Sequence, residues 1–210
     1  MALYPNARVY LEDVYDRYRS LEAYSDTGLS RSLGRRHPRL CKFETRYQSP
    51  GLFRFAFDSP HPSPRRRHLF SECVVGHDGA SPYIYSKHYS GPAGVEISES
   101  LDLAVAGATG ISSGTAHTIA ALLFAEVSGF TLLDLRRIRF RRNRIVLGVP
   151  CVCVSGLHPR AGRWTAWFGA EDMLLRRLYC SGLNSEELRF NPSTTPTFER
   201  EDFDAPHVEA

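Results

Sequence analysis

Apolar and polar residues alternate in short stretches over most of the chain, which is the pattern of β-strands with one buried face. The clearest case is LFRFAF at 52–57, where Phe53, Phe55 and Phe57 stand two positions apart. Alternate side chains leave a sheet on opposite sides, so the three rings share one face and need an apolar cover. Similar runs, bounded by Gly, Pro, Asp or Asn, predict strands at 28–34, 39–48, 68–76, 81–86, 135–148, 149–157, 163–169 and 173–182.

The N-terminal segment has a helical period instead. Its apolar residues recur every three to four positions, at Val9, Tyr10, Val14, Tyr18 and Leu21. This spacing predicts an amphipathic helix over residues 6–23, ended by SDTG at 25–28.

The middle of the chain, residues 96–127, is rich in Ala, Leu, Ser and Gly and shows little alternation of β-branched residues. We expect two short helices here. Ser98 or Ser100 caps the first, and the second runs from Thr115 to about Glu126.

The order of elements is therefore helix, meander, helix pair, meander. It predicts an α+β fold in one domain, 1–210: a single curved antiparallel sheet with the N-terminal helix and the central helices over its concave side. The polar, Pro-bearing end, 189–210, is expected to form a final edge segment and then a tail that is mobile from about residue 192.

Composition narrows the class of protein. The formal charge is +3, and 24 of the 26 basic residues are arginine, Lys42 and Lys87 being the exceptions. No apolar run is long enough for a transmembrane helix, and the first twenty residues lack the features of a secretory signal. We therefore expect a cytoplasmic protein, or a periplasmic or cell-envelope protein whose leader has been removed.

Metal and cofactor sites have no support in the sequence. The five cysteines match no common zinc spacing, and no two of the eight histidines stand four apart with an acidic neighbour. We expect buried free thiols, no metal and no cofactor.

GISSG at 110–114 matches the G-x-S-x-G nucleophile elbow, with Ser112 as nucleophile and Asp134 and His158 following in the required order. The elbow belongs between a buried strand and a helix in alternating strand–helix units, which this chain lacks. We therefore expect a small-residue connection between helices and no enzymatic activity, and keep a serine hydrolase as the third hypothesis.

LRRIRFRRNR at 135–144 places Arg137, Arg139 and Arg141 on one strand face and Ile138 and Phe140 on the other. Such a stripe suits phosphate binding or a solvated outer face that discourages edge pairing. Acidic residues elsewhere nearly balance the charge, so we expect the solvated face and no nucleic acid partner.

Other aromatic residues repeat the spacing of two. Tyr83 and Tyr85 form a second pair, and Trp164, or else Thr165 with Trp167, gives a third. These rings can form an ordinary core or line a lipophilic cavity, and the pattern alone leaves both open.

Several longer stretches resemble the periplasmic lipoprotein carriers, the LolA and LolB-like fold. They are YDRYRSLEAYSDTGLSRSL, FETRYQSPGLFRFAF and VVGHDGASPYIY in the N-terminal half. In addition, DLAVAGATGISSGTAHTIAALLF, GVPCVCVSG, WTAWFGAEDMLLRR and NPSTTPTFEREDFDAP look like a branch of predicted exported proteins with that fold. The family's lid-holding arginine before the strand proline is replaced here by Ser49, which favours another ligand or none.

The resemblance implies an incomplete β-barrel of about eleven strands whose apolar concave face is covered by a helical lid and accepts acyl chains. It implies these ligand-binding residues: Phe53, Phe55, Phe57, Tyr83, Tyr85, Leu122, Leu123 and Phe124.

Three functions follow as hypotheses. The first is a monomeric, non-catalytic carrier of a hydrophobic ligand, such as a lipid, an acyl chain or a lipidated protein, with a peripheral membrane or envelope partner. The second is a structural or partner-binding domain whose hollow is filled by its own side chains. The hydrolase is the third.

Overall fold

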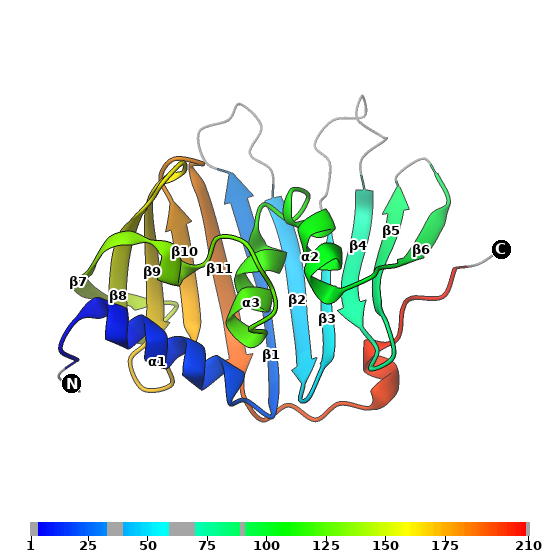
Figure 1. The fold of residues 1–210 in the computed structure, drawn as a ribbon, viewed down its shortest axis with the longest axis horizontal. Helices are drawn as coiled ribbons and strands as arrows, with labels where there is room; N and C mark the ends of the chain where they lie inside the picture. The colour runs from blue at the N-terminus through cyan, green and yellow to red at the C-terminus, as the bar shows by residue number, and fades with distance from the viewer. Residues whose placement is uncertain (1–3, 33–39, 59–69, 89–90, 209–210) are drawn as a thin grey trace.

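Eleven strands form one open antiparallel sheet in a computed structural model that describes residues 4–32, 40–58, 70–88 and 91–208. The spatial order is β6-β5-β4-β3-β2-β1-β11-β10-β9-β8-β7, so the sheet is not closed into a barrel (Figure 1). The strands are β1 Ala23–Ser32, β2 Leu40–Gln48, β3 Leu52–Asp58, β4 Phe70–His77, β5 Pro82–His88, β6 Ala93–Ile97, β7 Arg136–Val146, β8 Val149–His158, β9 Gly162–Gly169, β10 Leu175–Cys180 and β11 Ser185–Ser193. The predicted class, a curved antiparallel sheet with helices, is confirmed.

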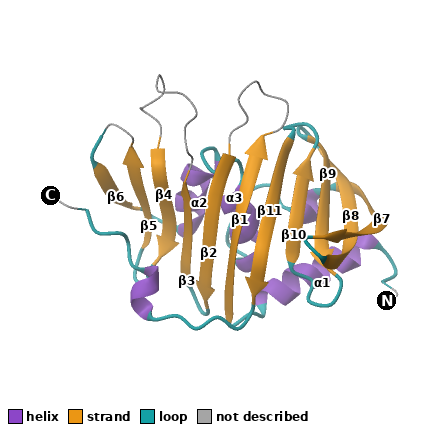
Figure 2. Ribbon diagram, turned by 180° about the vertical axis from the view of Figure 1, so that it is seen from behind, coloured by secondary structure: helices purple, strands orange, loops and turns teal. Residues whose placement is uncertain are grey.

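Three α-helices lie on one face of the sheet: α1 Ala7–Arg19, α2 Leu101–Thr109 and α3 Thr115–Leu123. Figures 1 and 2, taken from opposite sides, show all three on the same side. We call this the helix-covered face and the opposite one the outer face. The helices α2 and α3 with their connection at 110–114 are called the lid.

The N-terminal helix is shorter than predicted. Asn6 begins it, because its side chain accepts hydrogen bonds from the backbone nitrogens of Arg8 (2.9 Å) and Val9 (3.1 Å). The helix ends at Arg19, and Ala23 already pairs with Gln48 of β2. The prediction of helix to residue 23 is wrong, because strand pairing outweighs the helical spacing there.

Capping side chains and backbone conformation set where the helices of the lid begin and end. Ser100, one of the two predicted caps, accepts a hydrogen bond from the backbone nitrogen of Leu103 (3.2 Å). Gly114 precedes α3 with a φ of 92°, a conformation that glycine adopts without strain. The helix ends at Leu123, earlier than the predicted Glu126, because Phe124 turns to extended backbone and packs against the sheet.

The last strand lies inside the sheet, so the prediction of a final edge segment is wrong. β11 pairs with β1 on one side and β10 on the other, and it joins the two meanders into a single sheet. The chain then runs along the sheet to a short 3-10 helix, Arg200–Phe203, whose Phe203 is buried (Figure 1). The mobility of residues 192–210 stays a prediction.

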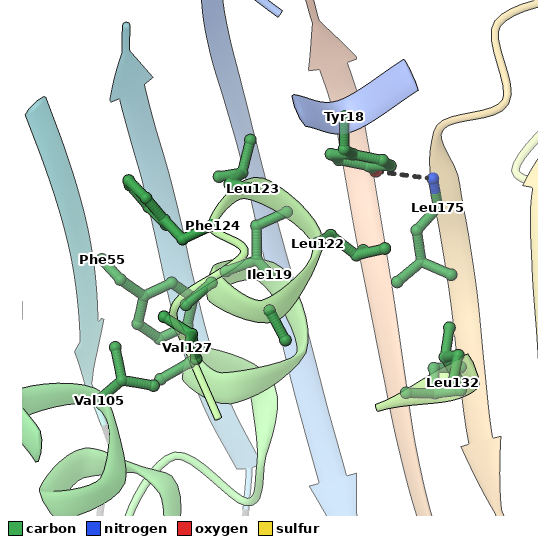
Figure 3. Close-up of a cluster of buried hydrophobic side chains, with 14 of the residues drawn as sticks. Tyr18, Phe55, Val105, Ile119, Leu122, Leu123, Phe124, Val127, Leu132 and Leu175 are labelled. Atoms are coloured by element: carbon green, nitrogen blue, oxygen red, sulfur yellow. Dashed lines mark hydrogen bonds between the residues drawn. The ribbon is translucent and has the colours of Figure 1, made fainter. Parts of the chain in front are cut away.

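One apolar core fills the space between the helices and the sheet. Figure 3 shows Ile119, Leu122 and Leu123 of α3 pointing at the strands beside Phe55 and Val105. Tyr18 of α1 also reaches the sheet, where its hydroxyl oxygen accepts a hydrogen bond from the backbone nitrogen of Leu175 (2.9 Å). The helices are therefore held mainly by apolar burial against the strands.

Alkaline pH is expected to destabilise this core. All five cysteines are free and buried, and burial raises the pKa of the Cys41 and Cys73 thiols to about 12. Below about pH 9 both states keep these protons, so the contribution to stability is complete there. As the pH rises toward 12 only the unfolded chain releases them, and each thiol then lowers the free energy of unfolding by about 1.4 kcal/mol per pH unit.

Urea unfolding at pH 8, 9.5 and 11 measures this loss. The double variant Cys41→Ala/Cys73→Ala should lose stability less steeply than the parent protein over the same range. Equal slopes in the two proteins would contradict the assignment to these thiols.

Candidate functional site

The three alternating phenylalanines of residues 52–57 lie in the packed core. Phe53, Phe55 and Phe57 are on the helix-covered face and almost without exposed surface. The ring of Phe55 stacks on Phe43 at 5.4 Å between centroids, and the ring of Phe53 meets Phe124 edge-on at 5.4 Å. The space in front of this row is occupied by side chains of the lid and by Phe124, which follows it.

The predicted lid residues Leu122, Leu123 and Phe124 are also buried (Figure 3). They face the strands from the end of α3, as the resemblance implied. A ligand would reach them or the phenylalanine row only after the lid moved away from the sheet. The ligand-binding role of these six residues stays a prediction.

Tyr83 and Tyr85 do not share a face with the phenylalanines. In the register, Phe55 lies opposite Val75 and Val75 opposite Ile84, so these three share the helix-covered face. The two tyrosines therefore lie on the outer face, where Tyr83 donates a hydrogen bond to the carbonyl oxygen of Phe203 (2.8 Å). Their assignment to the hollow is corrected by strand register, which the spacing of two within one strand does not reveal.

A cavity of about 480 Å³ lies elsewhere on the helix-covered face, between the lid and strands β1, β9, β10 and β11. This volume is within the usual range of small-molecule sites. None of the eight predicted ligand-binding residues lines it. Its apolar wall is formed by Ala106, Phe130, Trp164, Leu178, Cys180 and Leu183.

Stacked rings form one side of the cavity. Phe130 follows the lid, and its ring contacts His158 at 3.7 Å and Trp164 at 5.8 Å between centroids. The imidazole of His158 stacks on Trp164 at 5.2 Å, and desolvation followed by the charge of Arg160 lowers its pKa. Phe130 and Trp164 therefore give the cavity an aromatic wall, and the His158 imidazole that contacts them favours its neutral form.

Polar residues at the rim of the cavity connect the segment after α3 to the lid by hydrogen bonds. Asp102 of α2 accepts two hydrogen bonds from Ser128, one from its backbone nitrogen and one from its hydroxyl, both 2.8 Å. The ring nitrogen Nε2 of His117 lies 2.8 Å from the carbonyl oxygen of Ser128. Gly129 has a φ of 107°, and a Cβ there would stand 2.8 Å from His117 Nε2, so only glycine fits.

A buried ion cluster lies at the inner end of the cavity. The Arg189 guanidinium, with no exposed surface, lies 2.6 Å from Asp26 and 2.5 Å from Glu187, which lines the cavity. Its Nη2 donates to the carbonyl oxygen of Thr115 at 3.3 Å. The cluster thereby joins β1, β11 and the start of α3.

Opposite charges surround the buried Arg189 guanidinium and favour its charged form. Desolvation would lower the Arg189 pKa, but the charges of Asp26 and Glu187 outweigh it and raise that pKa well above its ordinary value. Desolvation raises the pKa of the Glu187 carboxyl, against the lowering effect of Arg189. At this end the cavity is lined by Glu187, whose charge is paired with Arg189. Among the described residues that line the cavity here, none is a free cation.

The Ser112 arrangement has no triad geometry. The Ser112 hydroxyl is buried and bonds the backbone of Thr109 (3.4 Å) and Ala116 (3.3 Å). Asp134 instead caps the short helix at 132–134, and the Nδ1 of His158 accepts two backbone hydrogen bonds. The segment is the small-residue connection that the sequence predicted.

In the described part of the chain, His, Cys, Asp and Glu side chains nowhere gather in a group that could hold a metal ion. The helices described there are also too short or too polar to cross a bilayer.

Sequence reasoning noticed Trp164 but missed most of the cavity. The register places Trp164 on the helix-covered face, and Thr165 with Trp167 on the outer face, which decides between the two alternatives. Phe130 and Leu183 lie in connections, where alternation gives no signal. Glu187 and Arg189, two apart and opposite in charge, were the available signal for a buried ion pair.

No family model and no curated protein sequence matches this chain. Solved structures do match. LprF from Mycobacterium bovis is 13% identical, with a TM-score of 0.53 over 92% of this chain and 96% of LprF. An uncharacterized conserved protein from Thermus thermophilus is 6% identical, with a TM-score of 0.53 over 94% of each chain.

MucB is 12% identical, with a TM-score of 0.52 over 96% of this chain. The chain spans only 63% of the length of MucB. Identities this low show the fold alone. Together with the open sheet and its lid, these likenesses confirm the predicted fold, a curved antiparallel sheet with helices over one face.

Proposed function

We propose that this protein is a non-catalytic carrier that holds a hydrophobic ligand, such as an acyl chain or a lipid, in the cavity beneath the lid. The observation that carries the proposal is the cavity of about 480 Å³ with an aromatic and aliphatic wall. Apolar surface in such a wall gains free energy when an apolar molecule replaces water. The LolA-like fold adds support by analogy only.

The polar groups of the cavity indicate where the ligand's polar end lies. Asp102, Ser128 and His117 stand at the rim and already bond one another, whereas Trp164 and Leu178 line the apolar wall. We therefore propose that the apolar part lies along β9 and β10 with the polar end at the rim. A lipidated protein would leave its polypeptide outside, a role that fits the periplasm or cell envelope.

Filling the cavity is the direct test. Ala106 of α2 lines the cavity and is exposed, so Ala106→Trp should block it without disturbing the core. We expect at least a tenfold loss of affinity for the lipophilic dye N-phenyl-1-naphthylamine, read from dye fluorescence. In a Trp167→Phe background Trp164 is the only tryptophan, and its fluorescence should change when the dye binds.

Leu103→Trp is the matched control. Leu103 is an exposed residue on the same helix and is not part of the cavity wall, so this variant should bind the dye like the parent. If Ala106→Trp and Leu103→Trp bind the dye with equal affinity, the ligand does not bind in this cavity.

A second candidate function is a structural or partner-binding domain. It is favoured by one observation: the hollow in front of Phe53, Phe55 and Phe57 is filled by the protein's own side chains. Native mass spectrometry separates the two functions. A carrier should co-purify with lipid, whereas bare mass together with no dye binding would favour the second candidate.

A further inference from the structure

The charge of this protein is concentrated at one end of the sheet. Residues 135–169, which span β7, β8 and β9, contain eight arginines and no acidic residue. The whole chain carries +3, so the other 175 residues together carry −5. The arginines are Arg136, Arg137, Arg139, Arg141, Arg142, Arg144, Arg160 and Arg163. An excess of this size creates a positive potential around that end.

The geometry gathers part of this charge on the outer face. Arg139, Arg141 and Arg144 lie opposite Ser155, Cys153 and Cys151 of β8. The two cysteines belong to a small cluster on the outer face, separate from the core beneath the helices. β7 is the terminal strand, at the far end of the sheet from β6 (Figure 1).

These arginines are not neutralised within the protein. None of the eight is in an ion pair with an acid of the described chain, whose salt bridges involve Arg31, Arg46, Arg176, Arg177 and Arg189. Arg137, Arg139 and Arg163, with Leu157, line a small depression of about 140 Å³. Three guanidinium groups around one depression suit an anionic group.

Exposed aliphatic side chains stand beside the charge. Ile145 is 74% exposed and Leu147 49% exposed at the turn from β7 to β8, next to Arg144. Neither contributes to the core: Ile145 lies near the end of β7, opposite Pro150, and Leu147 lies in the turn to β8. Segments that enter the interface of an anionic bilayer combine exposed aliphatic side chains with neighbouring cationic ones.

We infer that this end of the sheet docks on an anionic lipid bilayer. The arginines on β7 and β9 bind lipid phosphates, and Ile145 and Leu147 enter the acyl boundary. Nucleic acid offers the same negative charge but no apolar phase for the two aliphatic side chains. The inference does not depend on what the cavity binds.

Co-sedimentation with unilamellar vesicles tests this docking. We expect binding to phosphatidylcholine vesicles with 30% phosphatidylglycerol, and at least tenfold weaker partition onto pure phosphatidylcholine. Binding should fall as NaCl rises from 50 to 500 mM. Arg139→Ser/Arg144→Ser should weaken partition about tenfold or more, and Ile145→Ser/Leu147→Ser should weaken it without changing the salt dependence.

Arg17→Ser/Arg19→Ser is the matched control, because it removes the same charge from exposed positions on α1. It should bind the vesicles nearly like the parent. Equal losses in the two arginine pairs, equal binding to neutral vesicles, or tighter binding to duplex DNA than to the vesicles would overturn the inference. Ala106→Trp should leave vesicle binding unchanged, which separates this result from any failure of the cavity proposal.

Discussion

Replacing Arg189 by methionine is expected to destabilise the protein by about 3–5 kcal/mol, because it removes one partner of a buried ion cluster. Asp26 and Glu187 would remain in the interior without the charge that compensates them. The carbonyl of Thr115 would also lose its donor, which loosens the start of α3. Urea unfolding at pH 7 measures the loss.

Two comparisons isolate the electrostatic cause. Adding Asp26→Asn and Glu187→Gln to Arg189→Met should restore most of the stability, since no uncompensated charge is then buried. Arg46→Met, which breaks ion pairs with the partly exposed Glu44 and Asp202, should cost about 1 kcal/mol or less. An Arg189 variant as stable as the Arg46 variant would refute the role of the cluster.

The pH dependence of the Arg189→Met defect has a defined sign. Desolvation raises the pKa of the Glu187 carboxyl and the charge of Arg189 lowers it, so loss of the guanidinium moves the folded-state pKa of Glu187 further above its unfolded value. Stability is then greater where Glu187 is protonated and falls as the pH rises through its folded-state pKa. The defect should therefore be smaller at pH 4.5 than at pH 7.

Phe55→Ala is expected to cost about 3–5 kcal/mol of stability while leaving the affinity of the cavity for N-phenyl-1-naphthylamine unchanged. Phe55 has no exposed surface and packs between Phe43 and Phe57. It lies outside the cavity wall, so its removal leaves a void in the core and leaves the ligand's contacts intact. Urea unfolding and dye titration give the two readouts.

Phe140→Ala is the control, since Phe140 lies on the terminal strand and is 37% exposed. The same chemical change there should cost much less, because little surface is withdrawn from water. If Phe55→Ala binds the dye more weakly while its stability is nearly unchanged, the ligand contacts the phenylalanine row and the assignment to the cavity is wrong.

The sequence was sufficient for properties that depend on neighbours along the chain. Alternation at 52–57 fixed β3 and its buried face, and the three-to-four spacing in 6–23 identified α1. Ser100 was recognisable as a cap because capping involves only the next three residues. These signals, with the element order, were enough for the α+β class, a curved antiparallel sheet with helices over one side.

By itself, then, the sequence determined most of the strands and helices, though not β6 or the extent of β11, and which residues of a strand share a face. Only the tertiary structure decided that β11 lies between β1 and β10, that Tyr83 and Tyr85 face away from the phenylalanines, and that Arg189 is buried in an ion cluster. The tertiary structure also decided that the cavity lies between the lid and strands β1, β9, β10 and β11, and not in front of the Phe55 ring. The physical reason is range: period and capping are set within a few residues, whereas strand partners and the distance between helix and sheet follow from packing between residues far apart in the chain.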